Sequence, residues 1–299
     1  MPPRMPLVSV FLLLFAAALC DAQTATCTNW KYIHPTSPWL AVVPGEINRW
    51  GTVVGSTYKS TGPHGSSVTY GYIHYSNGTF KTYMAPNASD TYFTRRNALG
   101  VTVGAYIDTT SVRHGHGLVL SGSNMVTVDY PGATGTSLTG INYWGTIVGN
   151  YYDPTHPEGG AFRLKNSVFT SIFYPGSVST DVASISDKGV IVGRYHDYKV
   201  PYIHGFTLTN GVYKTLDNPQ GSGLGGQGTA LNDINASGVV VGSYTPQTGP
   251  TNGFIYINGV FKNVAVPNYG FSPVDGINGY GYVVGTYGSG INAYTAHCQ

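Results

Sequence analysis

Aspartate and histidine residues in the middle of this 299-residue chain are of the types that bind metal ions or transfer protons. The candidates for such a centre are Asp108, Asp153, Asp197, His114, His116 and His196. Each aspartate follows a short β-branched segment, and the three carboxylates could converge as oxygen ligands for calcium or another divalent cation. Two of the histidines alternate along the chain, so on an extended segment their side chains would point the same way. These residues could therefore form the site of a hydrolase or a lyase.

A structural role explains the same residues, and we favour it. An aspartate that ends a strand can accept hydrogen bonds from the amides of its own loop. His116 stands at a place of a repeat where other copies carry Asn252 or Asn292, which indicates a shared hydrogen bond rather than catalysis. The usual constellations for glycoside or ester hydrolysis are absent, since Glu46 and Glu158 are the only glutamates and no Gly-x-Ser-x-Gly occurs. We expect no cofactor, with a bound cation as the alternative.

The elements that must position these side chains follow from a repeated phrase. Ile-Asn, two residues, Gly, three residues, Gly and an aromatic return six times, with small variations. The second glycines of the six copies are Gly55, Gly104, Gly149, Gly193, Gly242 and Gly285. A period of 43 to 49 residues is typical of a repeated supersecondary unit. Asn with Gly three residues later predicts a type I turn, and the second Gly predicts a crowded backbone contact or a bulge.

Each copy predicts four short antiparallel strands, because it divides into four segments and shows no helical period. Asn-Gly pairs such as Asn210-Gly211 and Asn258-Gly259 indicate hairpins between the third and fourth strands. Six such units are what a six-bladed β-propeller of four-stranded antiparallel blades requires, and a linear solenoid is the rival. We therefore expect an all-β fold.

The chain ends favour the ring over the solenoid. The last copy lacks its fourth segment, and residues 30–35 match the missing piece. The N-terminal strand would then close the last blade, formed by about 272–298 plus 28–35. Cys27 and Cys298 both map onto the turn between the third and fourth strands of that blade, so a disulfide between them would replace the missing turn.

The N-terminal segment predicts the compartment of the protein, and the composition limits the class of its partner. Residues 1–22 are predicted to be a secretory signal peptide, because Arg4 precedes an apolar run that is too short to span a membrane. Residues 23–299 would form a single propeller domain, secreted to the periplasm or the medium, without a membrane span and monomeric. Charged residues make up only 9% and the formal net charge is +2, which gives no electrostatic basis for binding nucleic acid.

Low charge with abundant Tyr, Asn, Ser and Thr suits the binding of a neutral polysaccharide or a cell-surface partner. Binding is expected on the long loops between the second and third strands and between successive blades, because tight turns leave less room. The candidate ligand-binding aromatic residues are Tyr92, Tyr198, Tyr202, Tyr269 and Trp39.

The repeat resembles the bacterial extracellular repeats called the HAF family over nearly the whole mature chain. The resemblance rests on Ile-Asn-x-x-Gly-x-Val-Val-Gly-x-Tyr followed by His-Gly-Phe or a variant. A good copy runs from Ile185 to Tyr195 with His204 to Phe206, although Ser186 stands in the Asn place. The resemblance implies secretion and a repeat fold, and it brings no reaction. The favoured interpretation is a secreted binding or interaction module, with a His/Asp hydrolase or lyase as the alternative.

Overall fold

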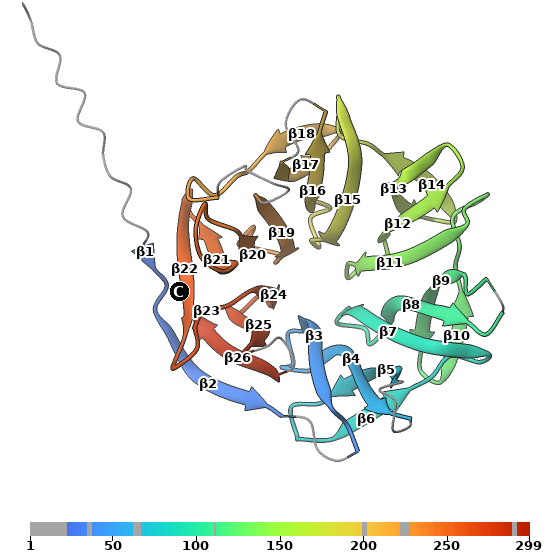
Figure 1. Ribbon diagram of the computed structural model, residues 1–299, viewed down its shortest axis with the longest axis horizontal. Coiled ribbons are helices and arrows are strands. Elements are labelled where there is room, and N and C mark those ends of the chain that lie inside the picture. Colours follow the sequence, from blue (N-terminus) through green and yellow to red (C-terminus); the bar gives the residue numbers. More distant parts are fainter. Residues whose placement is uncertain are drawn as a thin grey trace, which may run out of the picture.

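The chain forms a ring of six antiparallel sheets around a central axis (Figure 1). The computed structural model describes residues 23–34, 38–61, 67–110, 112–198, 202–221, 228–288 and 292–299, and only the backbone of His156, Pro157 and Phe271. All assigned elements in this part of the chain are strands, so the predicted all-β six-bladed propeller is confirmed. No helix long and apolar enough to cross a membrane occurs among the described residues. The predicted signal peptide, residues 1–22, lies outside them.

Five blades consist of four consecutive strands, with the first strand innermost (Figure 1). Blade 1 contains β3 (Ala41–Ile47), β4 (Val53–Ser60), β5 (Ser67–His74) and β6 (Phe80–Tyr83). Blade 2 contains β7 (Ala88–Arg96), β8 (Thr102–Asp108), β9 (Gly115–Ser121) and β10 (Asn124–Thr127). Blade 3 contains β11 (Gly135–Ile141), β12 (Ile147–Asp153), β13 (His156–Lys165) and β14 (Val168–Ile172). Blade 4 contains β15 (Ser177–Ile185), β16 (Ile191–Asp197), β17 (Ile203–Thr209) and β18 (Val212–Thr215). Blade 5 contains β19 (Thr229–Ile234), β20 (Val240–Tyr244), β21 (Asn252–Ile257) and β22 (Val260–Val266), with the short β23 (Gly270–Phe271) paired to β22.

The sixth blade joins the two ends of the chain. It contains β24 (Val274–Ile277), β25 (Tyr282–Tyr287), β26 (Asn292–Cys298) and, as its outermost strand, β2 (Cys27–Ile33). Cys27 lies opposite Cys298 in the β2–β26 ladder and forms the predicted disulfide with it. The preceding strand β1 (Gln23–Thr24) adds in parallel to β22 of blade 5. The N-terminal segment thus holds two neighbouring blades, which is the ring closure that the split repeat predicts.

The Asn of the repeated phrase connects its own turn to the next blade. In blade 3, Asn142 Oδ1 accepts hydrogen bonds from the amides of Trp144 and Thr146, and Gly145 adopts a φ of 77°. Its Nδ2 donates to the carbonyl of Ser186, the corresponding residue of blade 4, at 3.3 Å. The same bond between blades is made by the side chains of Asn97, Asn235 and Asn278. The bond from Asn278 to Asn48 joins the last blade to the first.

The second glycine of the phrase lies opposite a β-bulge. In blade 3 the register of β11 against β12 shifts between Leu138 and Gly140, and Gly149 faces the shift. A Cβ on Gly149 would lie 2.4 Å from the carbonyl oxygen of Ser137, so no larger residue fits without backbone movement. All six innermost strands carry the bulge at the same place. Both the crowded backbone contact and the bulge that the sequence predicts are therefore confirmed.

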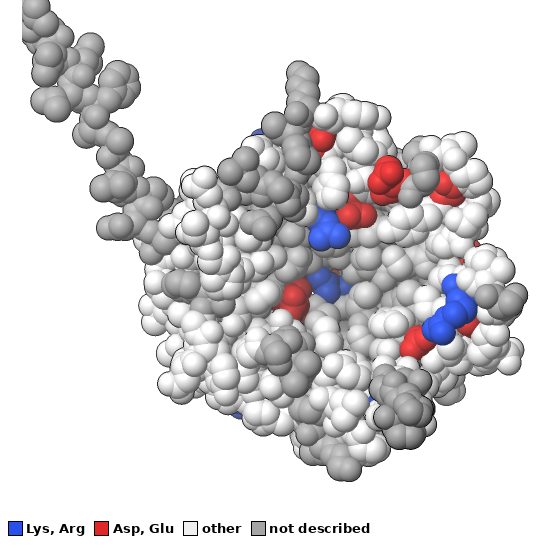
Figure 2. All heavy atoms as spheres, in the orientation of Figure 1, with Lys and Arg blue, Asp and Glu red and all other residues white. Residues whose placement is uncertain are grey.

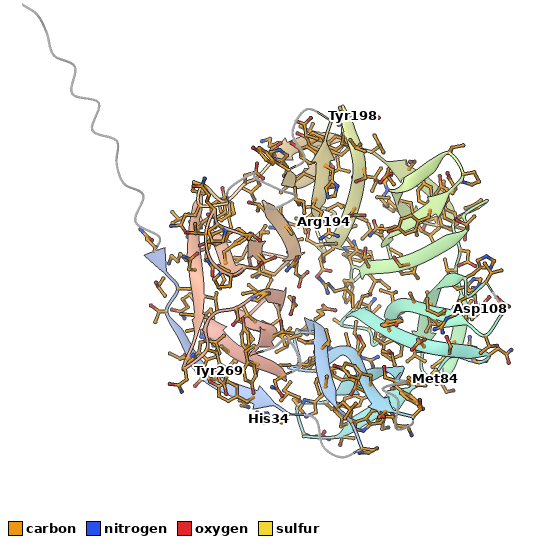
Figure 3. The ribbon with its side chains drawn as sticks, in the orientation of Figure 1. His34, Met84, Asp108, Arg194, Tyr198 and Tyr269 are labelled. Atoms are coloured by element: carbon orange, nitrogen blue, oxygen red, sulfur yellow. A yellow bond between two sulfur atoms is a disulfide. The ribbon has the colours of Figure 1, made fainter. Side chains whose placement is uncertain are left out.

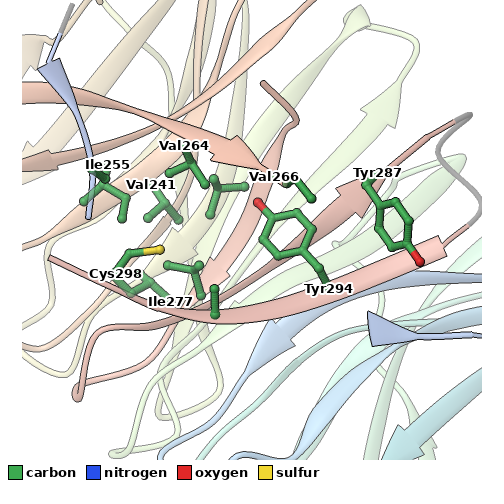
Figure 4. Close-up of a cluster of buried hydrophobic side chains, with 12 residues drawn as sticks. Val241, Ile255, Val264, Val266, Ile277, Tyr287, Tyr294 and Cys298 are labelled. Carbon is green, nitrogen blue, oxygen red and sulfur yellow. The ribbon is translucent and has the colours of Figure 1, made fainter. Parts of the chain in front are cut away.

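Six clusters of buried apolar side chains lie between neighbouring blades and form the core. Between blades 5 and 6, Val241, Ile255 and Val264 pack against Ile277 and Tyr294 (Figure 4). Because each cluster needs a blade on both sides, an unclosed ring would expose two apolar faces to water.

Candidate binding site on the propeller axis

Charged side chains gather on the propeller axis, directly after the bulge of each innermost strand. The equivalent residues of the six blades are Glu46, Arg95, Gly140, Ser184, Asp233 and Gly276. Half of these are charged in a chain whose charged content is 9%. The bulge aims them at the axis, where side chains from all blades converge.

Arg95 is only 7% exposed and lines both of the axial pits described below. Its guanidinium donates hydrogen bonds to backbone carbonyls of four bulge residues, which are Gly45, Thr94, Asn232 and Asp275. Its Nε lies 3.6 Å from Asp233 Oδ1. Asp233 also accepts a hydrogen bond from Ser184 Oγ at 2.6 Å and one from the amide of Ile277 at 2.8 Å. The guanidinium is thus an internal cation that contacts blades 1, 2, 5 and 6, and Asp233 extends the network to Ser184 of blade 4.

Two carboxyl groups beside Arg95 hold their protons unusually strongly. Burial, together with the nearby charge of Asp233, raises the pKa of Glu46 to about 8, although Arg95 and the Arg96 amide oppose the shift. Burial raises the pKa of Asp275 to about 7, again against the attraction of Arg95. Oδ2 of Asp275 is buried and has no hydrogen-bond partner, and the same is true of the Tyr72 hydroxyl. Near neutral pH the axis therefore contains protonated and half-protonated acids rather than three full negative charges.

One pit lies on the axis at each face of the ring. The turn-face pit, about 330 Å³, opens on the side of the Asn-x-x-Gly turns, and Glu46, Arg95, Arg96 and Asp233 form its floor. The loop-face pit, about 400 Å³, opens on the side of the long loops (Figure 2). Both pits are polar at the bottom and wide enough for a sugar-sized ligand.

Exposed aromatic residues lie in the turns on the same face as the turn-face pit. Trp50, Trp144 and Tyr280 occupy the third position of the turns in blades 1, 3 and 6 and are 61%, 73% and 61% exposed. Tyr143, beside Trp144, lines the pit itself, as does Tyr280. The type I turn needs its Asn and its Gly but places no demand on the third position, so these large rings do not serve the fold. The indole of Trp144 donates a hydrogen bond from Nε1 to the carbonyl of Asp187 and packs edge-on against the ring of Tyr143.

The loop-face pit is bordered mainly by groups that already bond one another. Arg194, which points toward the axis in Figure 3, pairs with Asp181 across the β15–β16 ladder at 3.1 Å. Asn150 uses both ends of its amide on the backbone of Val182. Tyr152 is the one aromatic residue among the side chains lining this pit.

The predicted His/Asp candidates do not line either axial pit. Asp108 Oδ1 accepts hydrogen bonds from Thr110 and from the amide of His114, and Asp153 does the same with Thr155. Both aspartates therefore order their own loops. The structure does bring Asp108 and His116 together, with Oδ2 and Nε2 3.5 Å apart.

His116 belongs to a network that recurs two blades later. Its Nδ1 lies 2.7 Å from Asp129 Oδ2, and its ring stacks on Tyr106. His204 makes the equivalent contacts with Asp217 and Tyr195 at the same distances. Burial lowers the pKa of His116, but the hydrogen bonds and charges of Asp129 and Asp108 outweigh burial and raise it overall. A network duplicated in two blades indicates a structural role.

The remaining candidates, His196 and Asp197, are neighbours in blade 4. His196 is exposed on β16, and Asp197 follows it at the end of the same strand. Among the described residues no group of three or more His, Cys, Asp or Glu side chains could hold a metal ion. A calcium site over blades 2 to 4 stays a prediction.

The predicted ligand-binding aromatic residues do not converge either. Tyr198 is 76% exposed and Tyr269 is 53% exposed, and they lie on opposite parts of the ring (Figure 3). Tyr202 contacts His204, and Trp39 packs edge-on against Tyr70 of its own blade. Tyr92 lies within the innermost strand β7 rather than in a loop.

Sequence reasoning missed both the axial charges and the aromatic turns. Arg95 stands two residues before the Asn of its turn, the place that Glu46 and Asp233 hold in blades 1 and 5. The Asn and Gly of these turns repeat in the copies and therefore indicate a role in the fold. The usable signal was the third turn position, where Trp50, Trp144 and Tyr280 are larger and more apolar than a turn requires.

Comparison with known proteins identifies the fold only. No family model matches the chain, and no curated protein matches it. Among solved structures, a gluconolactonase from Xanthomonas campestris is 11% identical with a TM-score of 0.51, and the match covers 93% of this chain and 98% of that one. A protein of unknown function from Dyadobacter fermentans is 9% identical with a TM-score of 0.50, covering 92% and 99%. The β-propeller domain of the Trilobed protease from Pyrococcus furiosus is 11% identical with a TM-score of 0.49, covering 88% and 94%. Membership of the HAF family stays a prediction.

Proposed function

We propose that the protein is a secreted saccharide-binding module whose site is the turn-face pit with its aromatic border. The observation that carries the proposal is a polar pit lined by Tyr143 and Tyr280, with the exposed Trp50 and Trp144 in the equivalent turns of the same face. Aromatic rings present a flat apolar surface with a polar edge, which suits the apolar face of a pyranose ring. The disulfide fits an oxidising compartment outside the cytoplasm.

The floor of the pit supports the same ligand class. Glu46, Arg96 and Asp233 offer both hydrogen-bond donors and acceptors within a recess of about 330 Å³. A sugar hydroxyl is both a donor and an acceptor, so it can bond such a mixed floor without a net charge of its own. A neutral sugar unit therefore fits the pit better than a simple ion does.

The alternative, a hydrolase or lyase that uses the His/Asp candidates, has less support. Asp108 and Asp153 are engaged in their own loops, and none of the six candidates lines an axial pit. The proposed module needs no cofactor and no second copy of the chain.

Titration with neutral oligosaccharides by isothermal calorimetry, without added metal, tests the proposal. We expect binding that the Trp144→Ala variant weakens about tenfold, which corresponds to about 1.4 kcal/mol. The matched control is Tyr198→Ala, which removes an equally exposed ring from the loop face of blade 4. An equal loss in both variants, or a loss in the control alone, would overturn the assignment of the site.

A further inference from the structure

A groove between blades 6 and 1 extends the turn-face pit outward. It has a volume of about 340 Å³, and its walls include Trp50 from blade 1 and Tyr280 and Tyr282 from blade 6. The pit and the groove share Arg49 and Tyr280 among their lining residues, so the two are neighbours. A ligand with more than one sugar unit could therefore occupy both.

Among the residues that the structure describes, the groove is lined by cations without acidic side chains, whereas the pit is lined by both. Lys31 from β2 and Arg49 from the blade 1 turn line the groove, and no aspartate or glutamate is among its described lining residues. The Arg49 guanidinium lies over the Trp50 ring, 4.6 Å from its centroid. Neither cation forms an ion pair with an acid in the part of the chain that the structure describes. Burial lowers the pKa of His74, the third basic group that lines the groove.

The pit, by contrast, contains acidic side chains beside its cations. Its lining contains Arg49, Arg95 and Arg96 together with Glu46, Asp187 and Asp233. An anionic group placed there would meet acidic side chains as well as cations. In the groove the same group would meet two unpaired cations beside aromatic rings, and such charges interact over several ångströms before salt screens them.

We propose that the groove is a subsite for an acidic group, so that the preferred ligand is an acidic oligosaccharide with a neutral unit in the pit and a carboxylate or sulfate at Lys31 and Arg49. This inference rests on the proposed saccharide binding at the pit. It narrows the ligand from saccharides in general to those with uronate or sulfate-ester units. The paired side chains of the loop-face pit offer no such unpaired cations.

Matched ligands test the subsite by calorimetry at low salt. The probes are a panel of neutral hexasaccharides and the same chains oxidised to uronates or sulfated at C6. We expect the acidic form to bind about three- to tenfold more tightly than its neutral parent, the range expected when two exposed ion pairs form. Lys31→Gln should remove part of this difference, because Lys31 is one of the two cations that line the groove.

Lys165→Gln is the matched control, since it removes one exposed cation from blade 3 and leaves the groove intact. The subsite is supported if the difference disappears in 0.5 M salt, shrinks in Lys31→Gln and persists in Lys165→Gln. The acidic form that binds more tightly then identifies the anion. Equal binding of neutral and acidic chains would overturn the subsite alone. Equal loss in both lysine variants would show a general attraction and also overturn it. If no chain of either kind binds, the saccharide function and the subsite fall together.

Discussion

At the scale of single residues, Asp275 occupies a position where other blades carry a hydrogen-bond donor. Thr94, Thr139 and Asn232 hold the same bulge position, and each donates to a carbonyl of the next blade at 2.8 to 2.9 Å. The corresponding carbonyl for Asp275 is that of Pro44, which lines the same pit. An ionised carboxylate cannot donate, and Oδ2 of Asp275 has no partner. Only the protonated acid can reproduce the bond between blades.

Replacing this acid with an amide should stabilise the protein above neutral pH. The pKa of Asp275 is raised to about 7 in the folded state, so folding retains its proton and the associated stability is lost as pH rises from about 4 through 7. Asp275→Asn carries a permanent donor, as Asn232 does, and should gain about 1–3 kcal/mol at pH 8 and little at pH 5. Urea unfolding at both pH values measures the effect. A variant less stable than the parent at pH 8, or a similar gain in the control Asp181→Asn, would contradict it.

At the scale of the element, the Asn-x-x-Gly turn both ends a hairpin and joins two blades. Ser186 is the natural exception, because its Oγ accepts the amide of Val190 but serine has no second group that could reach blade 5. Exchanging Asn and Ser at this position in blades 3 and 4 therefore tests the bond between blades in both directions.

Asn142→Ser and Ser186→Asn should change stability in opposite directions. The first removes the bond from Nδ2 to the Ser186 carbonyl and leaves the Trp144 amide without its acceptor, which we expect to cost about 1–3 kcal/mol. The second supplies the missing donor toward the Asn235 carbonyl and should add about 0.5–1.5 kcal/mol. Chemical denaturation of both variants measures the two effects. If both lower stability equally, the side chain acts within its turn only.

How much of this could be read from sequence depends on whether a feature repeats. The turns, the bulge opposite Gly149 and the strand order recur in the copies, so local chemistry predicts them. The axial cluster could not be predicted in the same way, because Arg95 and Asp233 are 138 residues apart and meet only once the ring places blades 2 and 5 across the axis (233 − 95 = 138). The aromatic border was overlooked because it lies within turns whose repeated residues serve the fold. Residues that differ between the copies come together only in the closed ring, so the repeat pattern does not predict their contacts.

At the scale of the whole molecule, two contacts close the ring: the β2–β26 ladder and the disulfide between Cys27 and Cys298. The disulfide links positions 271 residues apart, so it constrains the unfolded chain strongly. Chain-entropy arithmetic for a loop of this length gives about 5 kcal/mol as an upper figure. The adjacent core between blades 5 and 6 depends on the same closure, because Cys298 is part of that cluster.

Opening the disulfide should lower the melting temperature without opening the ring. The seven residues of β2 keep their ladder to β26, and β1 keeps its pairing with blade 5, so the reduced protein should remain folded at 25 °C. A loss of about 2–5 kcal/mol corresponds to a fall in melting temperature of about 4–10 °C for a chain of this size. Calorimetry of the Cys27→Ser/Cys298→Ser double variant measures it, and reductant should lower the melting temperature of the parent but not of the variant. An unchanged melting temperature in the double variant would mean that strand pairing alone closes the propeller. Loss of folding altogether would mean that the ladder cannot hold blade 6 without the covalent link.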